Sequence, residues 1–136
     1  MRDIKFRGKR IDNGKWIYGC LVQTFHEGVY ILKIPSFIPA KTLRAEIFIE
    51  VHSESVGQYT GLKDKNGREI YEGDVIDCSM SFRGGVLPHR GEIVLDEKFG
   101  AFATKNESGI TLLHNHRMSS IEVIGNKYDN PELLEK

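Results

Sequence analysis

Cationic side chains crowd the first fifteen residues of the chain, where only Asp3 and Asp12 offset them. The six cations are Arg2, Lys5, Arg7, Lys9, Arg10 and Lys15. In an extended strand Lys5, Arg7 and Lys9 share one face, because successive side chains point to opposite sides. Trp16 and Tyr18 on the next strand would add aromatic rings, and cations beside rings are typical of surfaces that bind single-stranded nucleic acid. The pattern therefore predicts a nucleic-acid-binding surface formed by Lys5, Arg7, Lys9, Trp16 and Tyr18.

The same cations have a purely structural interpretation. Natural sheets use charged side chains on edge strands to prevent pairing with another chain, and an N-terminal strand often lies at an edge. The two interpretations stay open at this point. They differ in one measurable property, because binding to phosphates weakens steeply with salt and edge protection does not.

A metal-like spacing occurs once, at His114 and His116. Residues two apart on a strand face the same side, so both imidazoles would reach one ion if Glu92 or Asp96 came from a neighbouring strand. This gives a second alternative function, a small metal-dependent hydrolase. Two histidines in a polar loop are more often solvated, and we expect neither a metal nor a cofactor.

Other catalytic patterns find little support in the sequence. The glycine-bearing segment 57–67 lacks the Lys-Ser/Thr pair and the helix that a phosphate-binding loop needs, so we expect its glycines to allow positive φ in tight turns. Glu72 and Asp74 precede an apolar strand and are expected to be solvated turn acids. No Gly-x-Ser-x-Gly motif is present. We assign no catalytic residue.

The composition is that of a cytoplasmic protein. The 136 residues are 40% hydrophobic and 28% charged, with 19 cations against 19 anions. No apolar run approaches the roughly 18 residues of a membrane span, and the charged N-terminus is unlike a signal peptide. Cys20 and Cys78 are far apart and belong to no metal motif, so we expect both to be buried and reduced.

Alternation of apolar and polar residues predicts an all-β chain. In the first half, strands are expected near residues 4–7, 15–23, 29–34 and 47–52, with an irregular connection at 35–44 and a short helix over 40–49 as the alternative. Between residues 69 and 124, five strands recur about every ten residues, with a loop at 83–88. That spacing predicts a five-stranded SH3-like barrel. The segment NPELL at 130–134 predicts a short helical turn.

These patterns divide the chain into two small β lobes. We place the N-terminal lobe at residues 1–55, a turn-rich hinge at 56–67, the barrel at 68–125 and a C-terminal tail at 126–136. Residues 1–55 carry nine Lys or Arg against six Asp or Glu, whereas residues 56–136 carry ten against thirteen. Opposite net charges on the two lobes favour head-to-tail contacts between copies of the chain. Each lobe of about 60 residues also buries only a limited core by itself. We therefore expect a homo-oligomer.

Three strings of residues resemble the YopX family of tailed phages and prophages. They are MRDIKFR at the N-terminus, VGQYTGLKDKNGREIYEGDVI at 56–76 and EVIGNKYDNPELL at 122–134. The resemblance implies a small uncharacterised phage protein with a β fold that includes an SH3-like barrel, and it supplies no catalytic residues. The signature residues that we interpret as structural are Gly57, Gln58, Tyr59, Gly61, Asp64, Gly67, Gly73, Asp74, Gly125, Asn130 and Pro131.

The sequence thus predicts a non-enzymatic accessory protein of a phage or prophage. We expect it to work in the cytoplasm of the bacterial host, to bind a host or phage macromolecule and to have no membrane partner. Nucleic-acid binding through the basic strand is the first alternative, and the metal-dependent hydrolase is the second.

Overall fold

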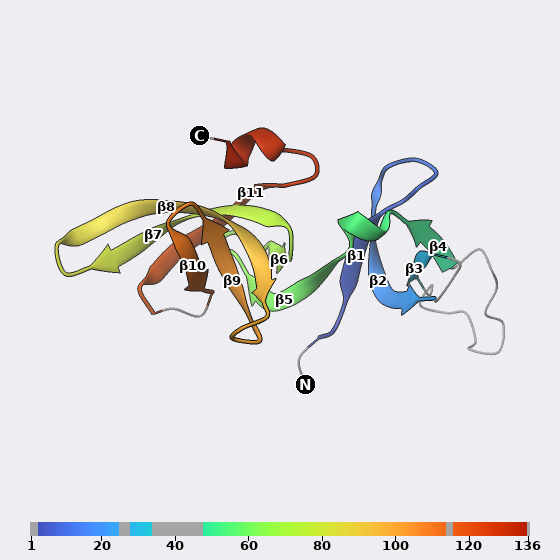
Figure 1. Ribbon diagram of the computed structural model, residues 1–136, viewed down its shortest axis with the longest axis horizontal. Coiled ribbons are helices and arrows are strands. Elements are labelled where there is room, and N and C mark those ends of the chain that lie inside the picture. Colours follow the sequence, from blue (N-terminus) through green and yellow to red (C-terminus); the bar gives the residue numbers. More distant parts are fainter. Residues whose placement is uncertain (1–2, 25–27, 34–47, 114–115, 136) are drawn as a thin grey trace. The chain divides into compact units, whose positions relative to one another are not determined.

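A computed structural model describes residues 3–24, 28–33, 48–113 and 116–135 (Figure 1). The described residues form strands and two short 3-10 helices, η3 (Ser53–Ser55) and η4 (Pro131–Leu134). The strands are β1 (Phe6–Lys9), β2 (Trp16–Gln23), β3 (Val29–Leu32), β4 (Phe48–Val51), β5 (Gly57–Lys63), β6 (Glu69–Tyr71), β7 (Asp74–Phe82), β8 (Gly85–Asp96), β9 (Ala101–Asn106), β10 (Gly109–Leu112) and β11 (Met118–Asn126). The predicted connection at 35–44 and most of its helical alternative lie outside the described residues.

The strands make two antiparallel sheets, which confirms the all-β prediction. The six-stranded sheet has the order β4-β3-β2-β1-β5-β6, and the five-stranded sheet has the order β10-β9-β8-β7-β11. The chain forms two compact units, residues Met1–Tyr59 and Thr60–Lys136, which we call the first and second units. The finer division at residues 55, 67 and 125 stays a prediction. No helix in the described segments has the length and hydrophobicity to cross a bilayer.

The five strands of the second sheet lie close to their predicted positions, but they do not close into a barrel. In the residues that the structure describes, β10 and β11 end the sheet and do not pair with each other. Alternation fixes which residues form strands and which face each side chain takes, whereas closure depends on a pairing between distant edges that alternation does not report.

The predicted loop at 83–88 is wrong as well. β8 begins at Gly85 and contains Pro88, which lies opposite Ser79 of β7, so only Arg83 and Gly84 connect the two strands. Proline within a strand is tolerated where one side of the strand has no partner. β8 pairs with β9 only from Glu92 onward, so Pro88 lies in a part of β8 that has a strand neighbour on one side.

The first unit packs its apolar side chains on one face of a curled sheet. Ile17, Ile31 and Val51 are buried together, and partly buried residues pack against them. The curl brings β4 back to the end of β1, where the His52 amide donates to the Lys9 carbonyl at 2.8 Å and Arg10 bridges Val51. β1 therefore lies inside the sheet, between β2 and β5. The interpretation of β1 as an exposed edge strand is wrong, because alternation reports the two faces of a strand and not its neighbours.

The second unit has its own apolar core, which includes Ile70, Ile76, Ile93 and Phe102. Cys78 belongs to this core, and burial, with a smaller effect from Asp77, raises the pKa of its thiol to about 11. The thiol is therefore protonated and unreactive at neutral pH. Cys20 is exposed on β2, so the expectation that both cysteines are buried holds for Cys78 alone.

A buried carboxylate, that of Asp64, joins the β5–β6 turn to β11. Its Oδ1 accepts hydrogen bonds from the amides of Asn66 and Arg68, each at 2.9 Å, and its Oδ2 accepts one from the Val123 amide at 3.0 Å. Burial, the largest single effect, raises the pKa of Asp64, but the three amides and the charge of Arg68 together outweigh it and hold the pKa below its usual value. The ionised carboxylate is therefore part of the fold.

The strand leading to this turn contains a glycine with positive φ. Gly61 has φ of +87°, where a β-branched side chain is strained, yet it lies within β5 and not in a turn. Thr60 satisfies the backbone around it, because its Oγ1 donates to the Ile70 carbonyl and accepts from the Leu62 amide. The expectation of positive φ also holds at Gly67, in the turn itself, but Gly57 has no positive φ.

The C-terminal signature folds back on the end of β11. A Cβ on Gly125 would lie 2.5 Å from Oδ1 of Asn130 and 2.8 Å from Cδ1 of Leu133, so only glycine allows this approach. Asn126 accepts the amides of Tyr128 and Asp129 on its Oδ1. The turn therefore holds η4 against β11.

We expect Asp64→Asn to lower the free energy of unfolding by about 2 kcal/mol at pH 7, because an amide cannot accept all three backbone hydrogen bonds as an anion does. The folded pKa is depressed, so this contribution is complete above the unfolded pKa of about 3.9 and is lost as the pH falls through the folded pKa. In urea unfolding, the difference in the free energy of unfolding between the wild type and Asp64→Asn should be large at pH 7 and small at pH 3. Asp96→Asn is the control, since Asp96 accepts one amide, that of Phe99. An equal loss of the free energy of unfolding in Asp64→Asn and Asp96→Asn would contradict the role of Asp64 as an ionised carboxylate that holds three amides.

Candidate functional site

Side chains of three strands in the first unit form a surface on the face of the sheet opposite the apolar core. Arg7 and Lys9 alternate with Phe6 and Gly8 along β1, so the cations leave the sheet on the side away from Ile17 and Val51. On β2, Trp16 lies opposite Lys9 and Tyr18 lies opposite Arg7. On the other side of β1, the Tyr59 amide of β5 donates to the Lys5 carbonyl. β1 is thus flanked by aromatic residues from both neighbouring strands.

Each cation lies over an aromatic ring. The Arg7 Cζ is 4.5 Å from the centroid of the Trp16 ring, and the Lys9 Nζ is 5.7 Å from the same ring. The Lys5 Nζ is 5.3 Å from the centroid of the Tyr59 ring. These distances are within the range in which the negative face of an aromatic ring attracts a cation. We call this set, Lys5, Arg7, Lys9, Trp16, Tyr18 and Tyr59, the cation–aromatic face.

The members of the face differ in their access to solvent. Arg7 exposes 3% of its surface and Tyr59 exposes 6%, whereas Tyr18 exposes 46%. Lys5, Lys9 and Trp16 are half-buried. Arg7 is therefore a packed part of the sheet, and only the two lysines, Trp16 and Tyr18 are accessible to a partner. A desolvated cation over a ring contributes up to about 2 kcal/mol to stability, more than an exposed one.

The structure brings all five residues of the predicted surface together. Sequence reasoning missed Tyr59, which was assigned to the signature alone, because the pairing of β1 with β5 joins segments about fifty residues apart. It also missed Cys20, which follows Tyr18 by two residues and is exposed. The alternation of Trp16, Tyr18 and Cys20 along β2 was the available signal for the second of these.

Of the other signature residues, Gly57 and Gln58 lie with Tyr59 at the start of β5 in the first unit, and those from Gly61 onward lie in the second unit. Asp64 holds the β5–β6 turn as described, and Asp74 Oδ2 accepts the Tyr71 amide at 2.7 Å where β6 turns into β7. Gly73 joins two segments, since its amide donates to the Ile93 carbonyl and its carbonyl accepts the Lys127 amide. Asp74 is completely buried, so its predicted role as a solvated turn acid is wrong.

The carboxylates suggested for a metal site have other partners. Glu92 makes an ion pair with Lys127 at 3.2 Å, and Asp96 accepts the Phe99 amide. Asp77, which was not among the suggested ligands, makes two hydrogen bonds with the Arg90 guanidinium, at 2.6 and 3.0 Å. His114 lies outside the described residues. Among those described, no three His, Cys, Asp or Glu side chains gather into a group that would hold an ion.

The second unit also contains an open groove of about 650 Å³. It lies between residues 88–92 of β8, the β9–β10 turn and η4, and its walls include Pro88, Lys105, Leu133 and Leu134. His89 forms part of one wall, where its Nε2 is 2.9 Å from Oγ1 of Thr104 and its burial lowers its pKa. The lining mixes apolar side chains with charges of both signs.

Comparisons with known proteins agree on the whole length of the chain. The model of one family, described as YopX protein, matches residues 5–135. The crystal structure of protein EF1440 from Enterococcus faecalis is similar with a TM-score of 0.57 and 24% sequence identity, covering 99% of this chain and 100% of that one. At that identity the likeness supports the fold alone. No curated protein matches the sequence.

A reciprocal exchange of cations tests whether Arg7 is packed as described. We expect Arg7→Lys to lower the free energy of unfolding by about 1 kcal/mol, because an ammonium is more strongly hydrated than a guanidinium and cannot stack on the Trp16 ring. Lys9→Arg, at a half-buried position over the same ring, should change the free energy of unfolding by less than about 0.5 kcal/mol. Trp16 is the only tryptophan of the chain, so urea unfolding followed by its fluorescence measures both. Equal effects of the two exchanges would contradict the packing.

Proposed function

The chain belongs to the YopX family, and on that premise we propose that it is a phage or prophage accessory protein that binds a macromolecule and catalyses no reaction. It works in the cytoplasm of the bacterial host and has no membrane partner. We interpret the second sheet as an SH3-like barrel that is left incompletely closed, since its strands are antiparallel and mostly joined in sequence order. Small folds of this kind commonly serve binding, although the argument for function must come from a site.

The observation that carries the proposal is the cation–aromatic face. Arg7 and Tyr59 are buried in it and fix its geometry, while Lys5, Lys9, Trp16 and Tyr18 present two positive charges and two rings to solvent. Rigid amphipathic rings beside cations make a favourable contact surface, because they lose little side-chain entropy on binding. The occupant that fits is a protein surface that offers acidic and apolar groups together.

Nucleic acid is the second candidate partner, and the exposed ring of Tyr18 is the observation that favours it. A base would stack on this ring while a phosphate meets Lys5 or Lys9. Burial of Arg7 reduces the predicted trio of phosphate contacts to these two lysines. The metal-dependent hydrolase gains no support from the described residues, and we do not carry it further.

Affinity capture from phage-infected or prophage-induced cells tests the leading proposal. We expect the wild type to retain a protein partner that the variant Lys5→Gln, Lys9→Gln, Tyr18→Ala does not retain. The control is the double variant Lys98→Gln, Phe99→Ala, which removes another cation–aromatic pair. In this pair the Lys98 Nζ lies 5.9 Å from the centroid of the Phe99 ring, and Phe99 exposes 61% of its surface. Equal capture by the wild type and by the face variant would contradict the proposal.

Titration of Trp16 fluorescence with a single-stranded thymidine oligonucleotide distinguishes the second candidate. Under the leading proposal, the oligonucleotide at 0.15 M salt leaves the emission unchanged. If nucleic acid is the partner, binding weakens with salt, and replacing Lys5 and Lys9 by Gln reduces the log–log slope by about 1.4, which is two phosphates at roughly 0.7 each. Salt-sensitive binding at sub-micromolar concentration would therefore replace the first proposal with the second.

A further inference from the structure

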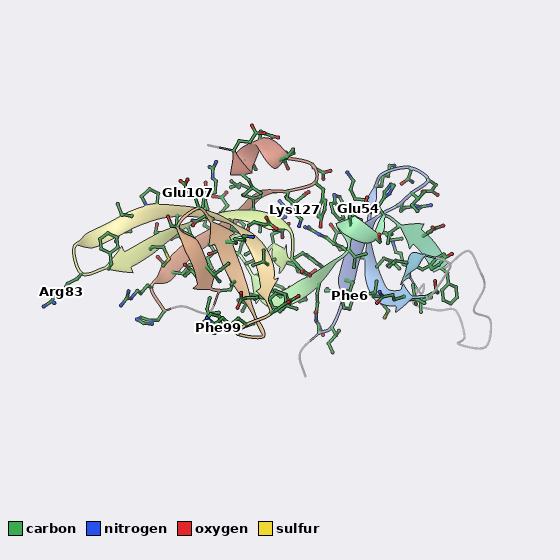
Figure 2. All side chains as sticks on the ribbon, in the orientation of Figure 1. Phe6, Glu54, Arg83, Phe99, Glu107 and Lys127 are labelled. Atoms are coloured by element: carbon green, nitrogen blue, oxygen red, sulfur yellow. The ribbon has the colours of Figure 1, made fainter. Side chains whose placement is uncertain are left out.

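Within the described residues, no third strand pairs with the end of the β7–β8 hairpin, which is a two-stranded ribbon. β11 pairs with β7 as far as Met80, which lies opposite Met118, and just beyond this pair the Ser81 amide donates to the Arg117 carbonyl. β9 pairs with β8 only from Glu92 onward. Figure 1 shows the hairpin continuing beyond the rest of the second sheet, and Figure 2 shows Arg83 at its far end. We call Phe82, Arg83, Val86 and Leu87 the arm end.

Apolar side chains are unusually exposed at the arm end. Phe82 exposes 44% of its surface, Val86 exposes 62% and Leu87 exposes 57%. Because Phe82 pairs with Gly85 and Met80 pairs with Leu87, Val86 leaves the ribbon on the face opposite the other two. A two-stranded ribbon has no core of its own, and clustered exposed apolar residues mark contact sites.

The charge of the arm has one sign. Residues 78–91 contain Arg83 and Arg90 and no Asp or Glu, although the second unit as a whole is acidic. Asp77 neutralises Arg90 through two hydrogen bonds, which leaves exposed Arg83 as the charge of the arm end. A partner of this surface should therefore combine apolar side chains with an acid.

The groove of the same unit offers that combination. Pro88, Leu133 and Leu134 give it apolar walls, and Glu135 supplies an acid at the end next to η4. Its cations are Arg90, which Asp77 neutralises, and Lys105 on β9. Another of its acids, Glu92, is neutralised by Lys127. The groove begins at Pro88, directly after the arm end in sequence, so one copy carries both complementary surfaces next to each other.

We propose that the occupant is a second copy of this chain, related by two-fold symmetry, with the arm end of each copy in the groove of the other. In such an interface each contact occurs twice, and Arg83 of one copy meets Glu135 of the other. One arm end is small beside the roughly 1,200–2,000 Å² that specific interfaces bury, whereas the symmetric pair covers two arms and two grooves. The inference rests on the self-association expected from the sequence and names its surface.

Light scattering of the full chain at micromolar concentration tests the proposal first. We expect twice the chain mass of 15.5 kDa for the wild type and the single mass for Leu87→Ser. Leu87 is largely exposed, so its replacement should not unfold the protein, and the melting temperature verifies this. Leu95→Ser is the matched control on the same strand, with 44% exposure, and should stay dimeric. A monomeric wild type, or a dimeric Leu87→Ser, would overturn the proposal.

Charge reversal identifies the partner surface. Arg83→Glu and Glu135→Arg should each weaken dimerisation at least tenfold, and the double variant should restore it, because both ion pairs are then reversed. Vesicles of phosphatidylserine and a single-stranded oligonucleotide serve as competing probes. Loss of binding to either probe in Arg83→Glu, without restoration of the dimer in the double variant, would assign the arm to lipid or nucleic acid and overturn the proposal.

The tests of dimerisation can fail without affecting the proposed function, and the reverse also holds. Arm variants keep the cation–aromatic face and should capture the same partner as the wild type. If Leu87→Ser remains dimeric, the assignment of the surface fails while macromolecular binding stands.

Discussion

A strand inside a sheet has both of its edges paired, so its side chains leave only through the two faces, and β1 has cations on one of these faces. On its apolar side, the core around Ile17 and Val51 supplies the cover. On the other side, Arg7 exposes 3% of its surface and packs against the ring of Trp16. The cation–aromatic face follows from this constraint, because the rings come from the strands that flank β1. The cation–aromatic face is thus a consequence of how the first unit folds.

In the second unit, hydrogen bonds to a few buried polar side chains hold the turns. Asp64 joins the β5–β6 turn to β11 through three amides, and Asn126 and Asn130 organise the turn that carries η4. These residues belong to the strings that resemble the family, and their contacts are within the protein. The signature of the central segment therefore describes the fold more than a ligand site.

Much of this fold could be predicted from sequence, since period-two alternation located β2, β9, β10 and β11 within a few residues and found the β7–β8 pair, although it missed the first half of β8. It could not give the neighbours of a strand. The interior position of β1, the contribution of Tyr59 and the open ends of the second sheet all depend on pairings between distant segments. Pro88 was misjudged for a related reason, because it lies where β8 has a strand on one side only. Cys20 was misjudged because alternation does not tell which face of β2 the core covers. The cations and rings of the site were found, but the burial that separates Arg7 from Lys5 and Lys9 was not.

Cys20 offers the most direct measurement of the central claim, that the cation–aromatic face is the contact surface. It is exposed two residues beyond Tyr18, whereas Cys78 is buried with a raised pKa, so a thiol reagent labels Cys20 selectively. The rate of alkylation of Cys20 in the wild-type protein should fall several-fold when the captured partner is added. An unchanged rate at a partner concentration that saturates binding would place the contact elsewhere and contradict the account.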